Sequence, residues 1–311
     1  EQAAAHMADG YARAAGDLGV ALGSTGPGTT NMVSGLYEAA FVSSRLLVIT
    51  GQAETAFYGK GKGYVHEAEK QKLMLESVAS PRYVHEIGPM LKGVIESICS
   101  GRPQPGAIEV PIDLQYATTE NAVPELSFAD PVAPDADALA AVATRIESAD
   151  KRVILAGGGI ATHEARDALV AFAEKINAPV ITTPNGKGCM DPGHPLHIGP
   201  ILMHPPVREL VNEADLLIAI GTRFQAGTGG IKVKIQLPPM VHIDVDPRSI
   251  NLNFKAERSV ISDAERALRG LLEAGIGQGD SDYLETMQSL AVETRALYRE
   301  RVGPDHARVL D

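Results

Sequence analysis

Short apolar runs alternate with helical stretches along most of this chain, and this alternation restricts the fold more than any other feature. The apolar runs end in glycine, proline or polar residues, and they lie at 20–23, 46–50, 107–112, 152–156, 179–183, 215–220, 240–246 and 259–262. Helical patterns separate them, at 1–15, 31–43, 90–100 and 263–273. Strands that are apolar on both faces are typical of parallel sheets covered by helices. The sequence therefore predicts an α/β fold.

A change of composition near the middle of the chain predicts two doubly wound parallel-sheet domains. Residues 118–137 contain three prolines and several acids but few large apolar side chains, as linkers do. A length of 311 residues also fits two domains. The predicted segments are a first domain, a linker, a central domain and a second connecting segment, at 1–118, 119–136, 137–274 and 275–311.

Composition excludes several classes of partner. The net charge is −11, with acids and bases mixed along the chain, which disfavours binding to a phosphate backbone. No apolar run approaches the ~20 residues of a membrane span. Cys99 and Cys189 are isolated, and neither they nor the histidines have metal-ligand spacing. We expect a reduced, cytoplasmic protein with no nucleic-acid or membrane partner and no metal ligands in this chain.

Three motifs follow one another within the first 52 residues. The segment Glu1–Arg13 predicts a helix, Gly-Ser-Thr-Gly-Pro-Gly-Thr-Thr-Asn occupies 23–31, and Val-Ile-Thr-Gly-Gln occupies 48–52. Their order resembles the pyrimidine-binding domain of the thiamine-diphosphate enzymes, particularly the acetolactate synthase and 2-oxo-acid decarboxylase branch. In that family the glutamate that begins the first motif activates the cofactor, so the resemblance implies that Glu1 is catalytic. Taken alone, Glu1 would be an acid in the first turn of a helix, where the helix dipole favours it.

In the resembling family this carboxyl hydrogen-bonds a ring nitrogen of the aminopyrimidine. A carboxyl with that task needs burial and a raised pKa so that it can exchange a proton. We therefore expect Glu1 to be buried in the working enzyme.

The turn at 26–31 lies between a predicted strand and a predicted helix. Its glycines allow the backbone to approach a ligand closely, and a helix N-terminus offers free N–H groups. The resemblance places this turn beside the aminopyrimidine and the substrate. The candidate cofactor contacts are therefore Gly26, Pro27, Gly28, Thr29, Asn31 and Gln52. The alternative is a plain turn in which Thr30 or Asn31 caps the helix.

The segment Gly63-Tyr-Val-His66-Glu67 lies where acetolactate synthases carry Phe-Gln-Glu. His66 is a candidate proton relay or carboxylate partner, and the alternative is an ordinary loop histidine. The lysine that the family carries further along falls on Ser80. The substrate and the second chemical step therefore stay open.

Gly157-Gly-Gly159 follows a predicted strand but lacks the spacing of the dinucleotide fingerprint. It is similar to the central domain of the same family, which binds FAD in the synthases and another nucleotide or nothing in some relatives. The contacts that the resemblance implies are Arg102, Gly158, His204, Gly221, Arg223, Asp244 and Asp263. Gln225-Ala226 replaces an acidic pair of the synthases, so FAD, ADP and an empty cleft all stay open. The alternative is that His204 and Arg223 are capped or salt-bridged surface groups and that Asp244 ends a strand.

The resemblance extends from Glu1 to about Leu272. The family's third domain binds the diphosphate through Mg²⁺ with a Gly-Asp-Gly motif, which this sequence lacks. The resemblance thus implies a fragment whose first domain is N-terminally truncated, which would leave a sheet edge and a helix face uncovered.

The parent enzyme is expected to act on 2-oxo acids by decarboxylation with carboligation, as a homodimer or homotetramer. The alternatives are a simple 2-oxo-acid decarboxylase and a non-catalytic nucleotide-binding or regulatory module.

Overall fold

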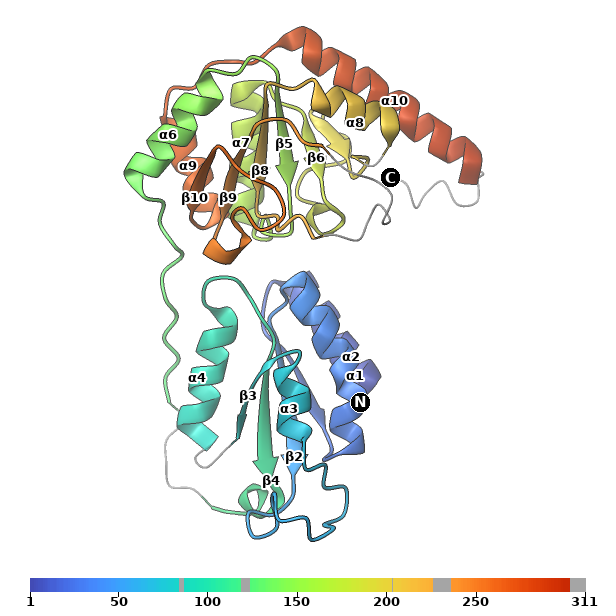
Figure 1. The fold of residues 1–311 in the computed structure, drawn as a ribbon, viewed down its shortest axis with the longest axis vertical. Helices are drawn as coiled ribbons and strands as arrows, with labels where there is room; N and C mark the ends of the chain where they lie inside the picture. The colour runs from blue at the N-terminus through green and yellow to red at the C-terminus, as the bar shows by residue number, and fades with distance from the viewer. Residues whose placement is uncertain (84–86, 119–123, 203, 226–235, 303–311) are drawn as a thin grey trace. The chain divides into compact units, whose positions relative to one another are not determined.

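The computed structural model describes residues 1–83, 87–118, 124–202, 204–225 and 236–302. It divides into two compact units, Glu1–Asp130 and Pro131–Asp311, and each contains a parallel sheet with helices on its faces (Figure 1). The predicted α/β fold with two parallel-sheet domains is confirmed.

The first unit contains a parallel sheet with strand order β1-β2-β4-β3. The strands are β1 (Gly19–Gly23), β2 (Leu46–Gln52), β3 (Ser80–Tyr83) and β4 (Gly106–Pro111). The helices are α1 (Gln2–Ala15), α2 (Pro27–Val42), α3 (Gln71–Glu76), α4 (Ile87–Cys99) and the short α5 (Ile112–Gln115).

The two faces of this sheet bury different residues, because successive side chains of a strand point to opposite sides. Val48 of β2 packs with α1, α2 and α3, whereas its neighbour Leu47 packs with Val94 and Ile98 of α4. Helices therefore cover the middle of the sheet on both sides.

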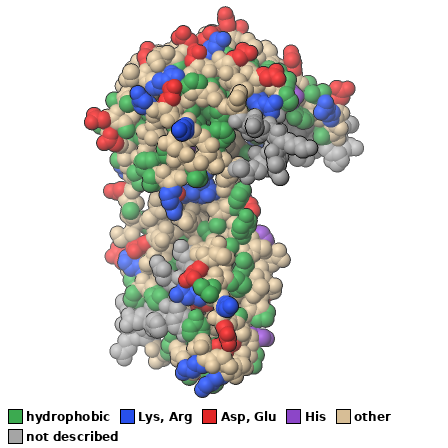
Figure 2. Space-filling model, in the orientation of Figure 1, with side chains coloured by type: hydrophobic (Ala, Val, Ile, Leu, Met, Phe, Trp, Pro, Cys, Tyr) green, Lys and Arg blue, Asp and Glu red, His purple; other side chains and the backbone are tan. Residues whose placement is uncertain are grey.

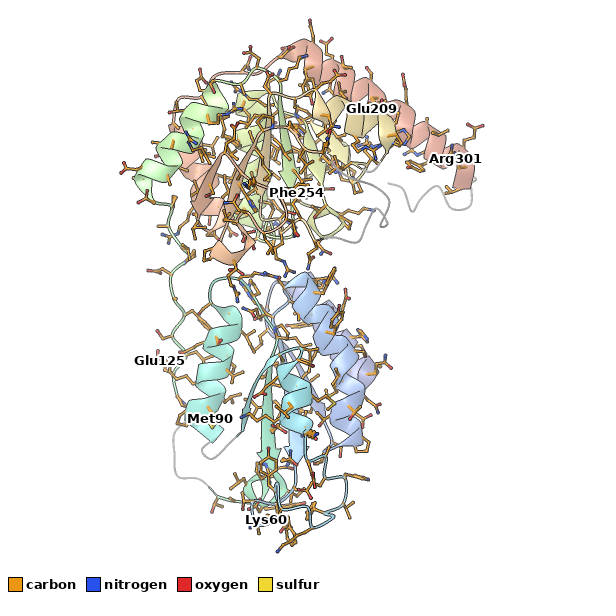
Figure 3. All side chains as sticks on the ribbon, viewed as in Figure 1. Lys60, Met90, Glu125, Glu209, Phe254 and Arg301 are labelled. Atoms are coloured by element: carbon orange, nitrogen blue, oxygen red, sulfur yellow. The ribbon has the colours of Figure 1, made fainter. Side chains whose placement is uncertain are left out.

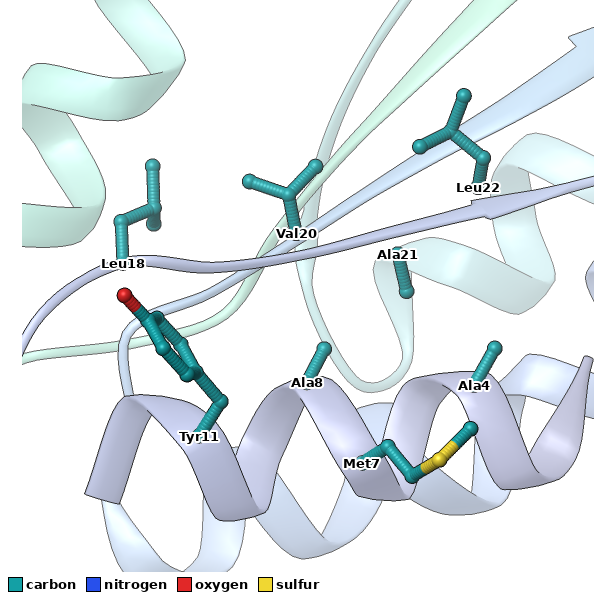
Figure 4. A pocket seen from close by; sticks show the side chains of 8 residues that line it. All are labelled: Ala4, Met7, Ala8, Tyr11, Leu18, Val20, Ala21 and Leu22. Atoms are coloured by element: carbon teal, nitrogen blue, oxygen red, sulfur yellow. The ribbon is translucent and has the colours of Figure 1, made fainter. Parts of the chain in front are cut away.

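Strand β1 is the edge of this sheet and is only partly covered. Ala21 points toward α1, but Val20 and Leu22 point away from it and are 46% and 70% exposed (Figure 4). A groove of about 490 Å³ lies between β1 and α1, where Met7 and Tyr11 are also exposed. Among the described residues, this edge strand and the adjoining face of α1 therefore expose apolar side chains to solvent.

The residues after the first sheet lie along α4. The Nζ atom of Lys92 donates to the carbonyl of Glu125, and the backbone N–H of Ser127 donates to Oε1 of Glu96 at 2.6 Å. Figure 3 shows Glu125 beside the helix that carries Met90. This part of the predicted linker is thus tied to the first unit.

The second unit contains a parallel sheet with strand order β10-β9-β8-β5-β6-β7. The strands are β5 (Arg152–Ala156), β6 (Val180–Thr182), β7 (His197–Gly199), β8 (Leu216–Ile220), β9 (Met240–Asp244) and β10 (Arg258–Ile261). The α-helices are α6 (Ala136–Glu147), α7 (His163–Ile176), α8 (Pro205–Asn212), α9 (Ala264–Glu273) and α10 (Ser281–Val302), and the 3₁₀ turns are η1 (Pro184–Gly186) and η2 (Pro247–Ser249).

Helices α6, α7 and α9 cover one face of this sheet, and α8 and α10 cover the other. Phe172 of α7 is fully buried in the first layer, and Met287 of α10 is fully buried in the second. The hydroxyl of Tyr283 on α10 also donates to the carbonyl of Leu210 on α8 at 3.1 Å. Helix α10, which lies within the predicted connecting segment 275–311, therefore packs against this unit.

Several elements differ from the sequence prediction. Helix α2 begins at Pro27 rather than at residue 31, because proline is well suited to the first helical position and Gly26 precedes it. The short elements α3, β3, β7 and α8 were not predicted, since each has at most eight residues.

Acidic and basic side chains are interspersed on the face shown in Figure 2. Among the described residues, no helix has the length and apolar character needed to cross a membrane.

Candidate functional site

The turn before α2 has a conformation that only glycine adopts easily. Gly26 has φ 56° and ψ −103°. A Cβ on this residue would lie 2.1 Å from the carbonyl oxygen of His66. The structure thus brings the backbone of the 63–67 loop against the turn, as expected if both belong to one site. The side chain of His66 itself is exposed, and its φ is 62°.

The side chain of Glu1 lies at the same turn. Its Oε2 accepts a hydrogen bond from Nδ2 of Asn31 at 3.3 Å. Its Oε1 lies 3.2 Å from the point that a Cβ on Gly28 would occupy. Glu1 therefore contacts both Gly28 and Asn31, although Glu1 and Asn31 are 30 residues apart in the sequence.

Glu1 is nevertheless exposed among the described residues. This differs from the burial that its predicted role requires. The physical reason is that Glu1 is the N-cap of α1, at the end of that helix, where its contact with Asn31 of α2 leaves it open to solvent.

Two of the predicted contact residues have side chains that are used inside the unit. Thr29 is fully buried, and its hydroxyl donates to the carbonyl of Ser24 at 2.9 Å. Gln52 is 1% exposed; its amide donates to Glu109 at 2.9 Å, and its carbonyl accepts from the backbone N–H of Ala53. These side chains hold the turn and the end of β2 rather than facing outward. Pro27 and Asn31, in contrast, are exposed.

A buried polar cluster lies beneath the turn, and sequence reasoning missed it. Glu109 of β4 is 0% exposed, and its Oε1 accepts from the side-chain amides of Gln52 and Gln71, both at 2.9 Å. Burial raises the pKa of Glu109, and the two amide donors offset part of that rise. An acid in the middle of the apolar run 107–112 was the available signal.

The carboxyl ends of three strands of the second unit meet at one edge of its sheet. The N–H of Gly157 donates to the carbonyl of Ile220, and that of Gly221 donates to the carbonyl of Ile243. The ends of β5, β8 and β9 therefore lie side by side, where doubly wound sheets form their ligand crevices.

The three glycines after β5 have different surroundings. A Cβ on Gly157 would lie 2.2 Å from the carbonyl oxygen of Gly221, and one on Gly159 would lie 2.7 Å from its Cα. Gly158 is exposed, and an added Cβ on it would lie 3.2 Å from the Cβ of Asn185. Close backbone packing accounts for Gly157 and Gly159, whereas a Cβ on Gly158 would meet only Asn185.

The remaining predicted nucleotide contacts have local partners. Asp263 is the N-cap of α9 and accepts from the N–H groups of Glu265 and Arg266, so it fills the helix-capping role. Asp244 is 6% exposed at the end of β9 and accepts from the N–H of Asp246 at 2.8 Å.

His204 is the N-cap residue of α8, and its ring lies 5.9 Å from that of Tyr298. The carbonyl of Arg223 accepts from Asn253 at 2.9 Å. Arg102 belongs to the first unit, where its guanidinium donates to the hydroxyl of Ser43 at 2.9 and 2.8 Å. Among the residues that the structure describes, no group of three or more His, Cys, Asp or Glu side chains could hold a metal ion.

Two family models match this chain. Residues 1–74 match the thiamine pyrophosphate enzyme N-terminal TPP binding domain, and residues 139–271 match the thiamine pyrophosphate enzyme central domain. The chain belongs to the thiamine pyrophosphate enzyme family. The resemblance carried by Glu1, the 26–31 turn and Gln52 is thereby confirmed at the level of the family, and thiamine diphosphate (thiamine pyrophosphate) is the cofactor that its domains indicate.

Curated relatives of this thiamine pyrophosphate enzyme include synthases and decarboxylases. The chain is 34% identical over 286 residues to a probable acetolactate synthase large subunit of Methanococcus aeolicus. This alignment covers 88% of this chain and 47% of that protein. It is 34% identical over 282 residues to the probable 2-ketoarginine decarboxylase AruI of Pseudomonas aeruginosa, covering 88% and 49%. The chain thus spans about half the length of these relatives.

A solved structure supports the fold. An X-ray structure of a protein from Mycobacterium smegmatis, assigned as a thiamin diphosphate-dependent enzyme, matches with a TM-score of 0.77 and 23% sequence identity. The match covers 91% of this chain and 55% of that one.

Proposed function

We propose that this chain supplies the pyrimidine-binding side of the cofactor site and the central domain of an enzyme that acts on 2-oxo acids, by decarboxylation with carboligation. The observation that carries this proposal is the contact of the Glu1 carboxylate with Gly28 and Asn31 at the turn before α2. The family match and the synthase relative support it.

The residues at the turn fit the aminopyrimidine end of thiamine diphosphate. A Cβ on Gly28 would lie 2.9 Å from the Cβ of Ser24 and 3.2 Å from Glu1, so glycine keeps the space beside the carboxylate open. The N-terminus of α2 adds N–H groups without helical partners. Glu1 would hold the ring, and the turn would line it.

Thiamine diphosphate, when bound, supplies an electron sink for cleavage of the bond beside a 2-oxo group. Glu1 would hold and exchange a proton at its carboxylate, and the side-chain amide of Asn31 would orient that carboxylate through its hydrogen bond to Oε2. Because Glu1 is exposed in this chain, we propose that its burial comes from the bound cofactor and from a neighbouring subunit. The parent enzyme would then be a homodimer or homotetramer, with Mg²⁺ held by residues outside this chain.

The test of this proposal is Glu1→Gln in the full-length parent, with Glu38→Gln on α2 as the matched control. Glu1→Gln should leave cofactor affinity nearly unchanged and slow exchange of the thiazolium C2 proton by roughly 100-fold or more, since it removes the group that exchanges the proton. Exchange is followed by NMR of the bound cofactor in deuterated solvent. Exchange at the wild-type rate in Glu1→Gln would refute the assignment.

Assembly has its own measurement. Light scattering of the active parent should give a dimer or a tetramer, because the proposed site needs a second subunit. A fully active monomer would contradict this part of the proposal. The 311-residue chain alone should show little binding of thiamine diphosphate by calorimetry.

Simple decarboxylation is the second candidate, and His66 favours it. His66 occupies the position where the synthases carry glutamine, and one curated relative is named as a decarboxylase. Product analysis of the parent with a single 2-oxo acid separates the two functions. Both functions release CO2; an aldehyde as the only other product supports the decarboxylase, and a 2-hydroxy-2-alkyl-3-oxo acid supports the synthase.

A further inference from the structure

We propose that Glu109 is a positioning residue, which fixes the cofactor turn at Gly26 through the side chain of Gln71. The inference rests on the proposed function only in taking this turn as the cofactor site. Glu109 lies on β4 and Gln71 begins α3, so the two residues connect the sheet, a helix and the turn.

Glu109 has no solvent access, and its contacts are polar. It is 0% exposed, and its Oε1 accepts from Nε2 of Gln52 and from Nε2 of Gln71, both at 2.9 Å. Its Oε2 is buried and has no hydrogen-bond partner among the described residues. A buried carboxyl held only by neutral amides is costly, and an apolar side chain at this place would be cheaper. The position therefore has a role that an apolar residue would not fill.

The contacts of Gln71 define that role. Its Nε2 faces three acceptors, which are the carbonyl of Gly51 at 3.0 Å, the hydroxyl of Thr50 at 3.4 Å and Oε1 of Glu109. Its Oε1 accepts from the backbone N–H of Gly26 at 2.8 Å. Reversing the amide would place its oxygen against the oxygens of Gly51 and Glu109. Glu109 thus fixes which end of Gln71 faces the turn.

Gly26, whose N–H is bound by Gln71, is the residue that shapes the turn. Gly26 has a positive φ, and its N–H is buried beneath the segment that carries Pro27 and Gly28. Gly28 in turn lies against the Glu1 carboxylate. A loss of the Gln71 hydrogen bond would release the turn relative to Glu1, and a displacement of about 1 Å at a reacting centre costs up to roughly 100-fold in rate.

The test uses four single variants of the full-length parent and the double variant Glu109→Leu/Gln71→Met. Glu109→Leu removes the acceptor from the sheet, Gln71→Met removes the link from the helix, and Glu109→Gln keeps an oxygen that can accept from both amides. Ser44→Ala, which changes a buried hydroxyl of the same unit, is the matched control. The readouts are hydrogen exchange of the Gly26 amide and exchange of the C2 proton at saturating thiamine diphosphate.

We expect Glu109→Leu and Gln71→Met each to expose the Gly26 amide and to slow C2 exchange by about 10- to 100-fold. Glu109→Gln and Ser44→Ala should stay within about 3-fold of wild type, and the double variant should be no slower than the slower single variant, because both act through one chain of contacts. If Glu109→Leu fails to fold, the inference is tested by Gln71→Met, which should expose the Gly26 amide and slow C2 exchange, and by Glu109→Gln, which should not.

Protection of Gly26 and C2 exchange that both stay at wild-type values in Glu109→Leu would overturn the inference. So would additive effects of Glu109→Leu and Gln71→Met. These results are separate from the fate of the proposed function. If Glu1→Gln slows C2 exchange and Glu109→Leu does not, only this inference fails; if Glu109→Leu exposes the Gly26 amide and Glu1→Gln has no effect, only the proposed function fails.

Discussion

The carbonyl oxygen of His66 lies 2.1 Å from the place where a side chain on Gly26 would begin. The two residues are far apart in the sequence, and each has a positive φ. This close approach joins the loop around His66 to the turn that meets Glu1. It also gives the turn no room for any residue other than glycine.

Gly26→Ala should therefore destabilise the first unit and disturb the cofactor turn. The added Cβ would require a shift of the His66 backbone, and alanine would also be strained at φ 56°. We expect a loss of about 2 to 4 kcal/mol in the free energy of unfolding, measured by urea denaturation.

Gly10→Ala is the matched control for this variant. Gly10 lies inside α1 with nothing within 4 Å of an added Cβ. Alanine there should stabilise by about 0.5 to 1 kcal/mol, because it reduces the entropy of the unfolded chain. Equal effects of the two substitutions would contradict the close approach of His66.

Gly157→Ala and Gly158→Ala should separate packing from ligand binding in the second unit. Gly157→Ala should cost about 2 kcal/mol or more, since its Cβ would lie 2.2 Å from the carbonyl oxygen of Gly221. Gly158→Ala has only Asn185 nearby, at 3.2 Å, and should keep the fold. Thermal unfolding of both variants compares their stabilities. A Gly157→Ala variant that is more stable than Gly158→Ala would contradict the prediction.

Nucleotide binding by the central unit stays a prediction, and it has a direct readout. If FAD binds, a flavin absorbance band should copurify with the parent, because the glycine turn and the ends of β5, β8 and β9 lie at the sheet edge where doubly wound folds bind their ligands. A colourless parent that binds neither FAD nor ADP by calorimetry would make the central domain a spacer.

Acid should weaken the attachment of α10 to the second unit. Burial lowers the pKa of His197 from its ordinary value of 6.5, and the nearby charge of Arg295 on α10 lowers it further. His194 acts in the same direction, and Asp191 acts against it. A histidine with a lowered pKa in the folded state stabilises the fold above its ordinary pKa, and that stability is lost as the pH falls below 6.5.

The measurement is the free energy of unfolding as a function of pH in wild type and in His197→Gln. The variant should lose less stability on acidification than wild type does. Some dependence should remain, because burial also lowers the pKa of His242. Identical pH curves for the two proteins would show that His197 does not contribute.

Local patterns were sufficient for the sheets and for the candidate turn. The runs that became β2, β5 and β8 were recognisable because both faces of a parallel strand are buried, so the middle of each run is continuously apolar. Gly26-Pro27-Gly28 was recognisable as a turn because glycine and proline interrupt strands and helices, although the start of α2 at Pro27 was placed four residues too late. The polar cap of α9 at Asp263 also has a local signal, although the resemblance directed attention to a nucleotide instead.

Relationships between distant residues depended on the tertiary structure. Gln71 and Glu109 are 38 residues apart, and they meet because β2, β4 and α3 converge on one sheet face. The exposure of Glu1 likewise follows from what covers the end of α1, which no local pattern records. The amino-acid order determined the strands, the helices and the turn, since these depend on periodicity and on the conformational range of glycine and proline. Which side chains face one another was decided by strand order and register, because those set distances between residues that are remote along the chain.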